Sequence, residues 1–167
     1  MEAALIREAL GPLIEGVDHF AIAVRDLESS IRWYEQALGF RVTERRTTRG
    51  AHTSMESAVL TCGQAMLVLV QGLEPECQVN RFIERRGEGV CHVAFAVSDL
   101  DEAIRRIERA SAVVALPTVE DSGIRQAFLQ GDAESGVRIE LIERRGGRFS
   151  ERSVQGMFTL LESHDLY

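Results

Sequence analysis

The chain has 167 residues, of which 45% are hydrophobic and 27% are charged, a balance that excludes disordered and fibrous proteins and predicts one globular domain. Its formal net charge of −7 argues against nucleic acids and anionic membranes as partners, because both need a cationic surface. No apolar run approaches the roughly 18 residues that cross a bilayer, and the charged N-terminal segment does not resemble a signal peptide, so we expect a cytoplasmic protein.

The lysine and cysteine content of the chain excludes or disfavours several kinds of catalytic and structural site. All 19 basic residues are arginine, which excludes Schiff-base lysines and lysine general bases. The three cysteines, Cys62, Cys77 and Cys91, are an odd number without a CxxC spacing, which disfavours both a disulfide framework and a zinc–cysteine site.

An internal duplication organises the chain. The segment GVDHFAIAVRDLESSIRWYEQA starts at Gly16, and GVCHVAFAVSDLDEAIRRIERA starts at Gly89; twelve of their 22 positions are identical. The offset of 73 residues is too long for a solenoid repeat. It predicts two copies of one half-domain module, related by a pseudo-twofold axis.

The N-terminal half of the chain predicts a helix followed by the first module. Residues 1–15 are expected to form a helix, and the module covers residues 16–72. It opens with a strand over His19–Val24, and Asp26 is an N-cap residue for the helix that follows. Three further strands are expected over residues 40–46, 54–61 and 65–71, and a short linker helix over residues 78–86.

The second module covers residues 89–143 and repeats this order. Its first strand starts at His92, Asp99 is the expected N-cap of its helix, and strands are expected over residues 113–118, 125–130 and 137–143. A glycine turn and a helix over residues 151–163 follow within the C-terminal segment 144–167. The prediction is therefore an α+β protein with two tandem βαβββ modules in a single domain, 16–143, and an extra helix at each end.

Each module begins with a histidine on a strand that has two different faces. His19 shares its face with Ala21 and Ala23, whereas Phe20 and the other bulky residues lie on the opposite face and are expected to be core. His92 has the same arrangement in the second module. A single such histidine is most simply a hydrogen-bonded core residue, but two at equivalent positions of a duplicated module are predicted to converge.

A carboxylate in the last predicted strand completes a candidate metal site. Glu140 lies in the apolar stretch RIELIER, where a buried carboxylate is costly unless it is paired or bound to a metal. The alternative is an edge strand on which Glu140 faces solvent. The equivalent position in the first module is Val68, while Gln71 alternates to the other face. His19, His92 and Glu140 thus predict two histidines and one carboxylate with open positions, as in non-haem Fe(II) oxygenases.

These features resemble the vicinal oxygen chelate superfamily, which includes glyoxalase I, methylmalonyl-CoA epimerase and extradiol dioxygenases. The resemblance rests on GVDHFAIAV, GVCHVAFAV and RIELIER, and covers about residues 16–143. It implies a half-open barrel built from the two modules, a divalent metal held by His19, His92 and Glu140, a small-molecule substrate and a homodimer.

A narrower resemblance is to the catalytic C-terminal domain of 4-hydroxyphenylpyruvate dioxygenases. It rests on QVNRFIERRGEGVCHVAFAVSDL, on MESAV and RQAFL, and on the tail IELIERRGGRFSERSVQGMFTLLES. It implies substrate-side positions for Ser57, Gln126 and Gln78, and it places Phe149 and Phe158 near a pocket gated by the C-terminal helix. Ordinary helix packing is the alternative for Phe158.

Three functions follow from these observations. The first is an Fe(II) dioxygenase acting on a small α-keto acid, with Gln126, Gln78 and Ser57 orienting the substrate and the C-terminal helix excluding water. The second is an epimerase or isomerase, with Co, Ni, Mn or Zn as the metal and Glu56 as a candidate base; the alternative for Glu56 is a solvated surface residue. The third is a ligand-sequestering resistance protein without catalysis.

Overall fold

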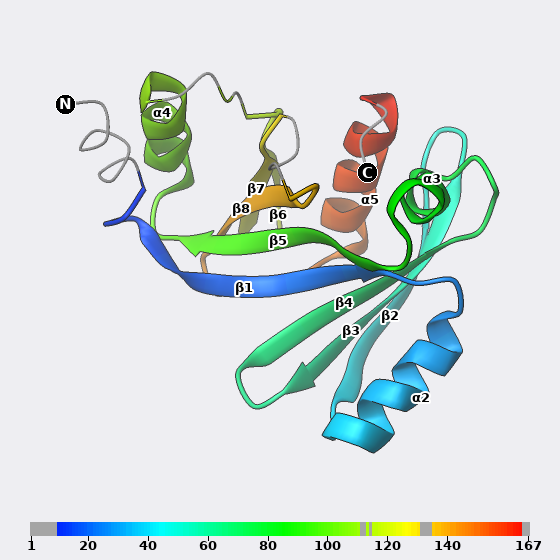
Figure 1. Ribbon diagram of the computed structural model, residues 1–167. Helices are drawn as coiled ribbons and strands as arrows, with labels where there is room; N and C mark the ends of the chain where they lie inside the picture. The colour runs from blue at the N-terminus through cyan, green and yellow to red at the C-terminus, as the bar shows by residue number, and fades with distance from the viewer. Residues whose placement is uncertain (1–9, 111–112, 114, 131–134, 165–167) are drawn as a thin grey trace. The chain divides into compact units, whose positions relative to one another are not determined.

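The computed structural model describes residues 10–110, 113, 115–130 and 135–164 (Figure 1). The chain divides into two compact units. One comprises the described residues among 19–92 and 154–167, and the other those among 1–18 and 93–153. No helix in the described part of the chain is long and apolar enough to cross a membrane.

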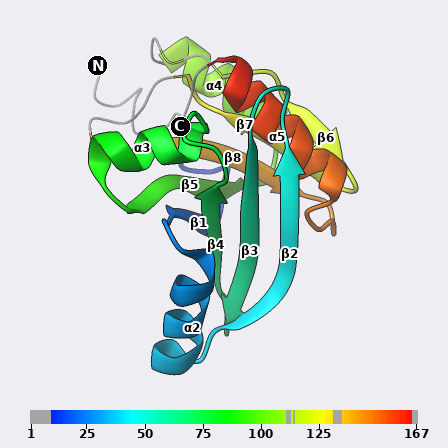
Figure 2. The same ribbon diagram turned by 90° about the vertical axis from the view of Figure 1, so that its right-hand side faces the viewer.

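The first unit contains most of the first module. It consists of β1 (Ile14–Ala23) from His19 onward, α2 (Leu27–Leu38), β2 (Arg41–Arg49), β3 (Ser54–Cys62), β4 (Ala65–Gly72), α3 (Gln78–Arg86) and the start of β5 (Gly89–Val97). Strand β1 runs parallel to β4, while β3 is antiparallel to both β2 and β4. Figure 2 shows β4, β3 and β2 side by side, with β2 at the edge.

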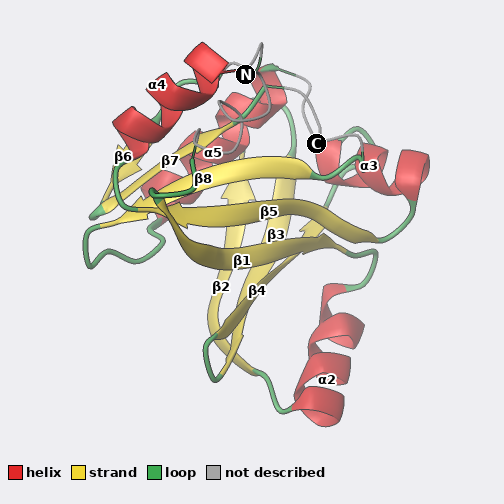
Figure 3. Ribbon diagram, turned by 60° about the vertical axis from the view of Figure 1, so that its left-hand side comes forward, coloured by secondary structure: helices red, strands yellow, loops and turns green. Residues whose placement is uncertain are grey.

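The second unit contains most of the second module. After β5 come α4 (Leu100–Ala110), β6 (Val119–Asp121), β7 (Ile124–Phe128), β8 (Arg138–Arg144) and the first turn of α5 (Glu151–Ser163). Strand β7 is antiparallel to both β6 and β8. Hydrogen bonds link the eight strands in the order β2-β3-β4-β1-β5-β8-β7-β6, a mixed sheet that confirms the α+β class (Figure 3).

The two modules begin their helices with the same interactions. Asp26 accepts a hydrogen bond from the Ser29 amide at 2.9 Å, and Asp99 accepts one from the Glu102 amide at 2.9 Å, as N-cap residues do. This confirms both predicted N-caps.

In each module, a side chain from the last strand also accepts a hydrogen bond from the first amide of that module's helix. Gln71 Oε1 accepts from the Leu27 amide at 2.7 Å, and Glu143 Oε2 accepts from the Leu100 amide at 3.0 Å. The pairing ties the fourth strand of each module to the first turn of its helix. The sequence repeat is therefore also a repeat of tertiary contacts.

Helix α2 buries one face of the β1–β4 sheet, and helices α3 and α5 bury the other. One apolar cluster lies under α2 and joins Leu27 and Ile31 to Ala58, Leu60 and Leu69. The cluster on the opposite face is built from residues of β1, β3, β4, α3, β5 and α5: Ala21, Ala23, Met55, Val70, Cys77, Val79, Phe82, Ile83, Cys91 and Phe158. Burial of this second face brings α5 over the strand that carries His19.

The structure corrects three sequence expectations. Phe20 is not core: it is 39% exposed, because the cluster under α2 reaches Ile22 but not Phe20. Residues 113–118 do not form a strand where they are described; Ala115 makes one isolated bridge and β6 starts at Val119, since Pro117 has no amide to extend a ladder. The helix expected over residues 1–15 does not reach its end, because β1 starts at Ile14; residues 1–9 lie outside the described residues.

Candidate metal centre

The two repeated histidines lie against each other. His19 on β1 is 3% exposed and His92 on β5 is 8% exposed. Their Nε2 atoms are 3.3 Å apart, and the rings meet edge to face with centroids 5.4 Å apart. The convergence expected from the duplication is therefore present, because hydrogen bonding places β1 and β5 next to each other in the sheet.

The alanines beside His19 let other elements pack closely on its face of the sheet. Ala21 and Ala23 have no exposed surface, and both belong to the cluster that contains Phe158. Cys91 is also in this cluster and donates its Sγ–H to the Ala21 carbonyl at 3.4 Å, as a small core residue. The surroundings of the histidine pair on this side are therefore apolar.

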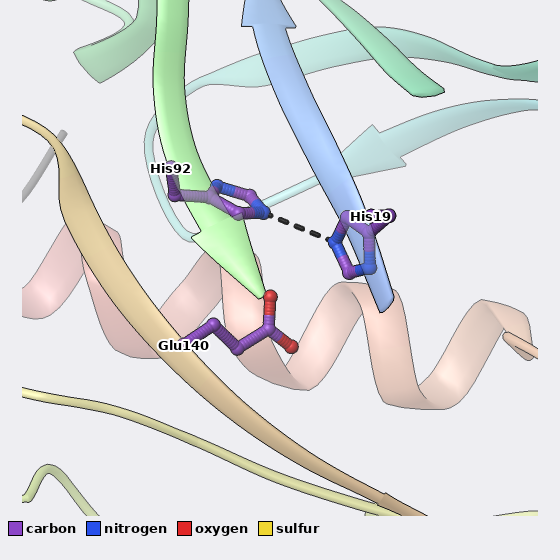
Figure 4. A group of neighbouring side chains, drawn as sticks. All are labelled: His19, His92 and Glu140. Carbon is purple, nitrogen blue, oxygen red and sulfur yellow. Dashed lines mark hydrogen bonds between the residues drawn. The ribbon is translucent and has the colours of Figure 1, made fainter. Parts of the chain in front are cut away.

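Glu140 is the third candidate ligand. It is 3% exposed on β8 and lies opposite Phe128 of β7, so the alternative of a solvent-facing carboxylate is wrong. Candidate ligand atoms of His19, His92 and Glu140 lie within 4.8 Å of one another. Figure 4 shows the Glu140 carboxylate pointing toward the two imidazole rings.

The donor set fits a divalent metal ion. Two nitrogens that are each about 2.1 Å from one ion and 3.3 Å apart subtend about 100° at that ion, between the octahedral and tetrahedral angles. The carboxylate would balance half of the charge of a divalent ion, and the two imidazoles would add neutral nitrogen donors. Buried side chains with this chemistry are typical of transition-metal sites.

The residue at the symmetry-equivalent fourth position is not a ligand. Val68 lies opposite Ala21 in the parallel β1–β4 pair and packs on the cluster that contains Phe158. Gln71 does not take its place, because its side-chain oxygen caps the Leu27 amide of α2. Neither residue therefore adds a fourth protein ligand.

The two glutamines expected to orient substrate each contact helix α5. Gln78 is 1% exposed and donates from Nε2 to the Phe158 carbonyl at 3.3 Å. Gln126 is 3% exposed and donates from Nε2 to the Ser153 carbonyl at 3.4 Å. Each glutamine thus holds the backbone of the helix predicted to gate the pocket.

Ser57 and Glu56 lie on opposite faces of β3. Ser57 pairs with Val70, a member of the Phe158 cluster, so it shares the side of the sheet that carries His19. Glu56 faces the α2 side and lines a groove with Glu28 and Arg45. The structure therefore does not bring Glu56 together with the histidines, because successive residues of a strand point to opposite faces.

Phe149 belongs to an arrangement that sequence reasoning missed. Its ring packs on a cluster of Ala94, Ile124 and Ile142, and the Arg144 guanidinium lies 4.7 Å from its centroid. Arg144 also makes a bidentate ion pair with Asp18, at 2.6 and 2.8 Å.

Asp18 directly precedes His19 in the chain, so this ion pair anchors the strand beside a candidate ligand. The signal in the sequence was a lone acidic residue within the apolar stretch GVDHF. Its counterpart in the second module is Cys91, so the duplication could not point to it.

Comparisons with known proteins show the family of this chain. Residues 16–141 match the model of the Glyoxalase/Bleomycin resistance protein/Dioxygenase superfamily. The uncharacterized protein YqjC of Bacillus subtilis is 26% identical over 137 residues, which are 81% of this chain and 96% of YqjC. A probable 4-hydroxyphenylpyruvate dioxygenase 2 of Aspergillus fumigatus is 25% identical over 71% of this chain, but this covers only 34% of the dioxygenase.

Solved structures show the same fold. A mutant 4-hydroxymandelate synthase from Streptomyces coelicolor superposes with a TM-score of 0.80 over 92% of this chain and 55% of its own, at 19% identity. Methylmalonyl-CoA epimerase from Mycobacterium tuberculosis superposes with a TM-score of 0.66 over 79% of this chain and 89% of its own, at 30% identity. With its two βαβββ modules and a family match over most of its length, this chain belongs to the Glyoxalase/Bleomycin resistance protein/Dioxygenase superfamily.

Proposed function

We propose that this protein is a metal-dependent enzyme of the superfamily, and specifically an Fe(II) dioxygenase that acts on a small α-keto acid. His19, His92 and Glu140 would hold the ion. The observation that carries the proposal is the composition of this donor set: two histidines and one carboxylate, with Val68 where a fourth ligand would stand. That set is typical of Fe(II) oxygenases, whose open positions take the substrate and O₂.

An ion held by His19, His92 and Glu140 would supply open positions at which a keto acid could chelate and O₂ could be activated. The surroundings in the chain suit that chemistry. Ala21, Ala23, Cys91 and Phe158 form an apolar wall on the His19 side, which would exclude water from the reaction. Ser57, which is 7% exposed on the same side of the sheet, would supply a hydroxyl group to contact a substrate.

A metal-dependent epimerase is the second candidate. The observation in its favour is the 30% identity to a methylmalonyl-CoA epimerase, which this chain matches over 89% of the epimerase. Its metal would polarise a carbonyl so that the neighbouring carbon gives up a proton. Because Glu56 faces α2, an epimerase would need a different base from the one expected from the sequence.

Metal content tests the proposed ligands. Protein purified without chelators and reconstituted anaerobically with Fe(II) should bind one ion per chain. Glu140→Ala should lower the affinity at least about tenfold, because a ligand is removed outright. The exposed Glu108→Ala serves as the matched control and should bind like the original chain. Unchanged iron content in Glu140→Ala would refute the site.

Oxygen consumption tests the reaction. The Fe(II)-loaded protein should consume O₂ and release CO₂ with at least one of pyruvate, phenylpyruvate and 2-oxoglutarate. An epimerase would instead exchange the α-proton of methylmalonyl-CoA with D₂O under strict anaerobiosis, and added O₂ would change nothing. Metal binding with neither activity would favour a ligand-sequestering protein.

A further inference from the structure

A carboxylate near the end of α5 is enclosed by the backbone of the β2–β3 hairpin. Glu162 accepts hydrogen bonds from the amides of Ala51 at 2.7 Å, His52 at 3.2 Å and Thr53 at 2.8 Å. The Thr53 hydroxyl donates a further bond at 2.7 Å. Consecutive amides that converge on one carboxylate form a strong, charge-assisted anchor.

The hairpin is shaped for this contact. A side chain at Gly50 would come within 2.8 Å of Phe158, so only glycine allows the turn to approach the helix so closely. Gln155 adds a bond from Nε2 to the Arg49 carbonyl at 3.2 Å. Burial raises the pKa of Glu162, but the hydrogen bonds from Thr53 and Ala51 outweigh this effect. The pKa therefore lies below the ordinary glutamate value, and the carboxylate stays ionised.

The anchored helix covers the face of the sheet that carries His19. Phe158 lies one turn before Glu162 and is 1% exposed, packed in the cluster that contains Ala21 and Ala23. Both alanines alternate with His19 on the same face of β1. In this arrangement α5 closes the histidine face of β1 from the side of the hairpin.

We propose that Glu162 is the latch of a lid formed by residues 154–163 of α5, and that entry of ligands to the histidine face from this side requires its release from the amides of residues 51–53. This proposal rests on the proposed function in one respect: the metal chemistry is the reason why a ligand would enter at this face. The latch itself is a property of the chain without metal or substrate, so it can fail or succeed independently of the chemistry.

Two cysteines report on the lid. Cys77 and Cys91 are 0% and 2% exposed within the Phe158 cluster, whereas Cys62 is exposed on β3. In the metal-free protein we expect Glu162→Gln to raise the rate of thiol labelling at Cys77 and Cys91 at least about tenfold, because a hydrogen-bonded charge is lost from the latch. Cys62 should react at one rate in every variant, as an internal standard read by mass spectrometry.

Two further variants sharpen the test. Glu151→Gln removes an exposed carboxylate from the first turn of the same helix and should leave all labelling rates unchanged. Thr53→Val removes the hydroxyl that bonds Glu162 and also its contacts with Gln78 and Cys77, so this variant is read at Cys91, where it should give an intermediate rate. Amide exchange in β3 and β4 reports global opening and should not change in Glu162→Gln. Unchanged labelling, or a rise matched by exchange in β3 and β4, would overturn the latch.

Discussion

At the scale of single residues, the candidate metal site is marked by three candidate ligands and by an apolar residue at the position of a fourth. His19 and His92 occupy equivalent positions of the two modules, but Glu140 has Val68 as its counterpart. Because Val68 lies opposite Ala21, on the face that holds His19, a carboxylate at position 68 would be directed to the side of the two imidazoles.

We predict that Val68→Glu retains metal at least as well as the original chain but loses O₂ consumption by about tenfold or more, because a fourth ligand would occupy a position that O₂ needs. The measurement is an oxygen-electrode trace with Fe(II) and the best keto acid. Val68→Leu keeps the site apolar and is the matched control. Equal O₂ consumption in Val68→Glu would show that position 68 does not face the metal.

At the scale of elements, both modules contain the same hydrogen bond between the fourth strand and the start of the helix, but the accepting side chains differ. Module one ties its fourth strand to its helix through an amide, Gln71, and module two does so through a carboxylate, Glu143. Burial raises the pKa of Glu143, but the bonds from the Leu100 amide and Arg145 and the charge of Arg125 outweigh it, so its pKa lies below the ordinary glutamate value. Only the second module should therefore be sensitive to acid through this contact.

The sign of that sensitivity follows from the lowered pKa. Stability from ionised Glu143 is complete above the unfolded pKa of about 4.3, and it is lost as the pH falls through the lower folded value. We predict that Glu143→Gln costs about 1 to 3 kcal/mol at pH 7 and flattens the decline of stability below pH 4.3. Urea unfolding between pH 3 and 7 measures this, with Glu108→Gln as the exposed control; parallel curves for both variants would contradict it.

At the scale of the whole molecule, strand β2 forms one edge of the sheet and pairs only with β3 among the described strands. Apolar side chains are also exposed in the first unit: Phe20 of β1 is 39% exposed and Trp33 of α2 is 58% exposed. A nine-residue edge strand is unusually long to leave open, since it offers amides and carbonyls to another chain.

We therefore predict a homodimer, as expected from the sequence. Light scattering at micromolar concentration should give twice the chain mass of 18.6 kDa. The mass should not fall in 0.5 M salt if apolar contacts and strand edges dominate over ion pairs. A monomeric mass at low salt would contradict the prediction.

Local patterns and the duplication were sufficient to predict much of this protein. Asp26 and Asp99 were identifiable as N-caps because capping depends on residues within one helical turn. The histidine pair was predictable because two equivalent strands of related modules lie side by side. Glu140 stood out because a carboxylate in an apolar strand needs a partner.

Contacts between residues far apart in the sequence decided the rest. Gln78 bonds to Phe158, 80 positions later, and Glu162 reaches a hairpin more than 100 positions earlier. Neither partner is implied by spacing or composition, so the sequence could suggest a polar role for Gln78 but not its target. Which face of β1 becomes core was likewise decided by what packs on it: α5 buries the alanines beside His19, while α2 leaves Phe20 partly exposed.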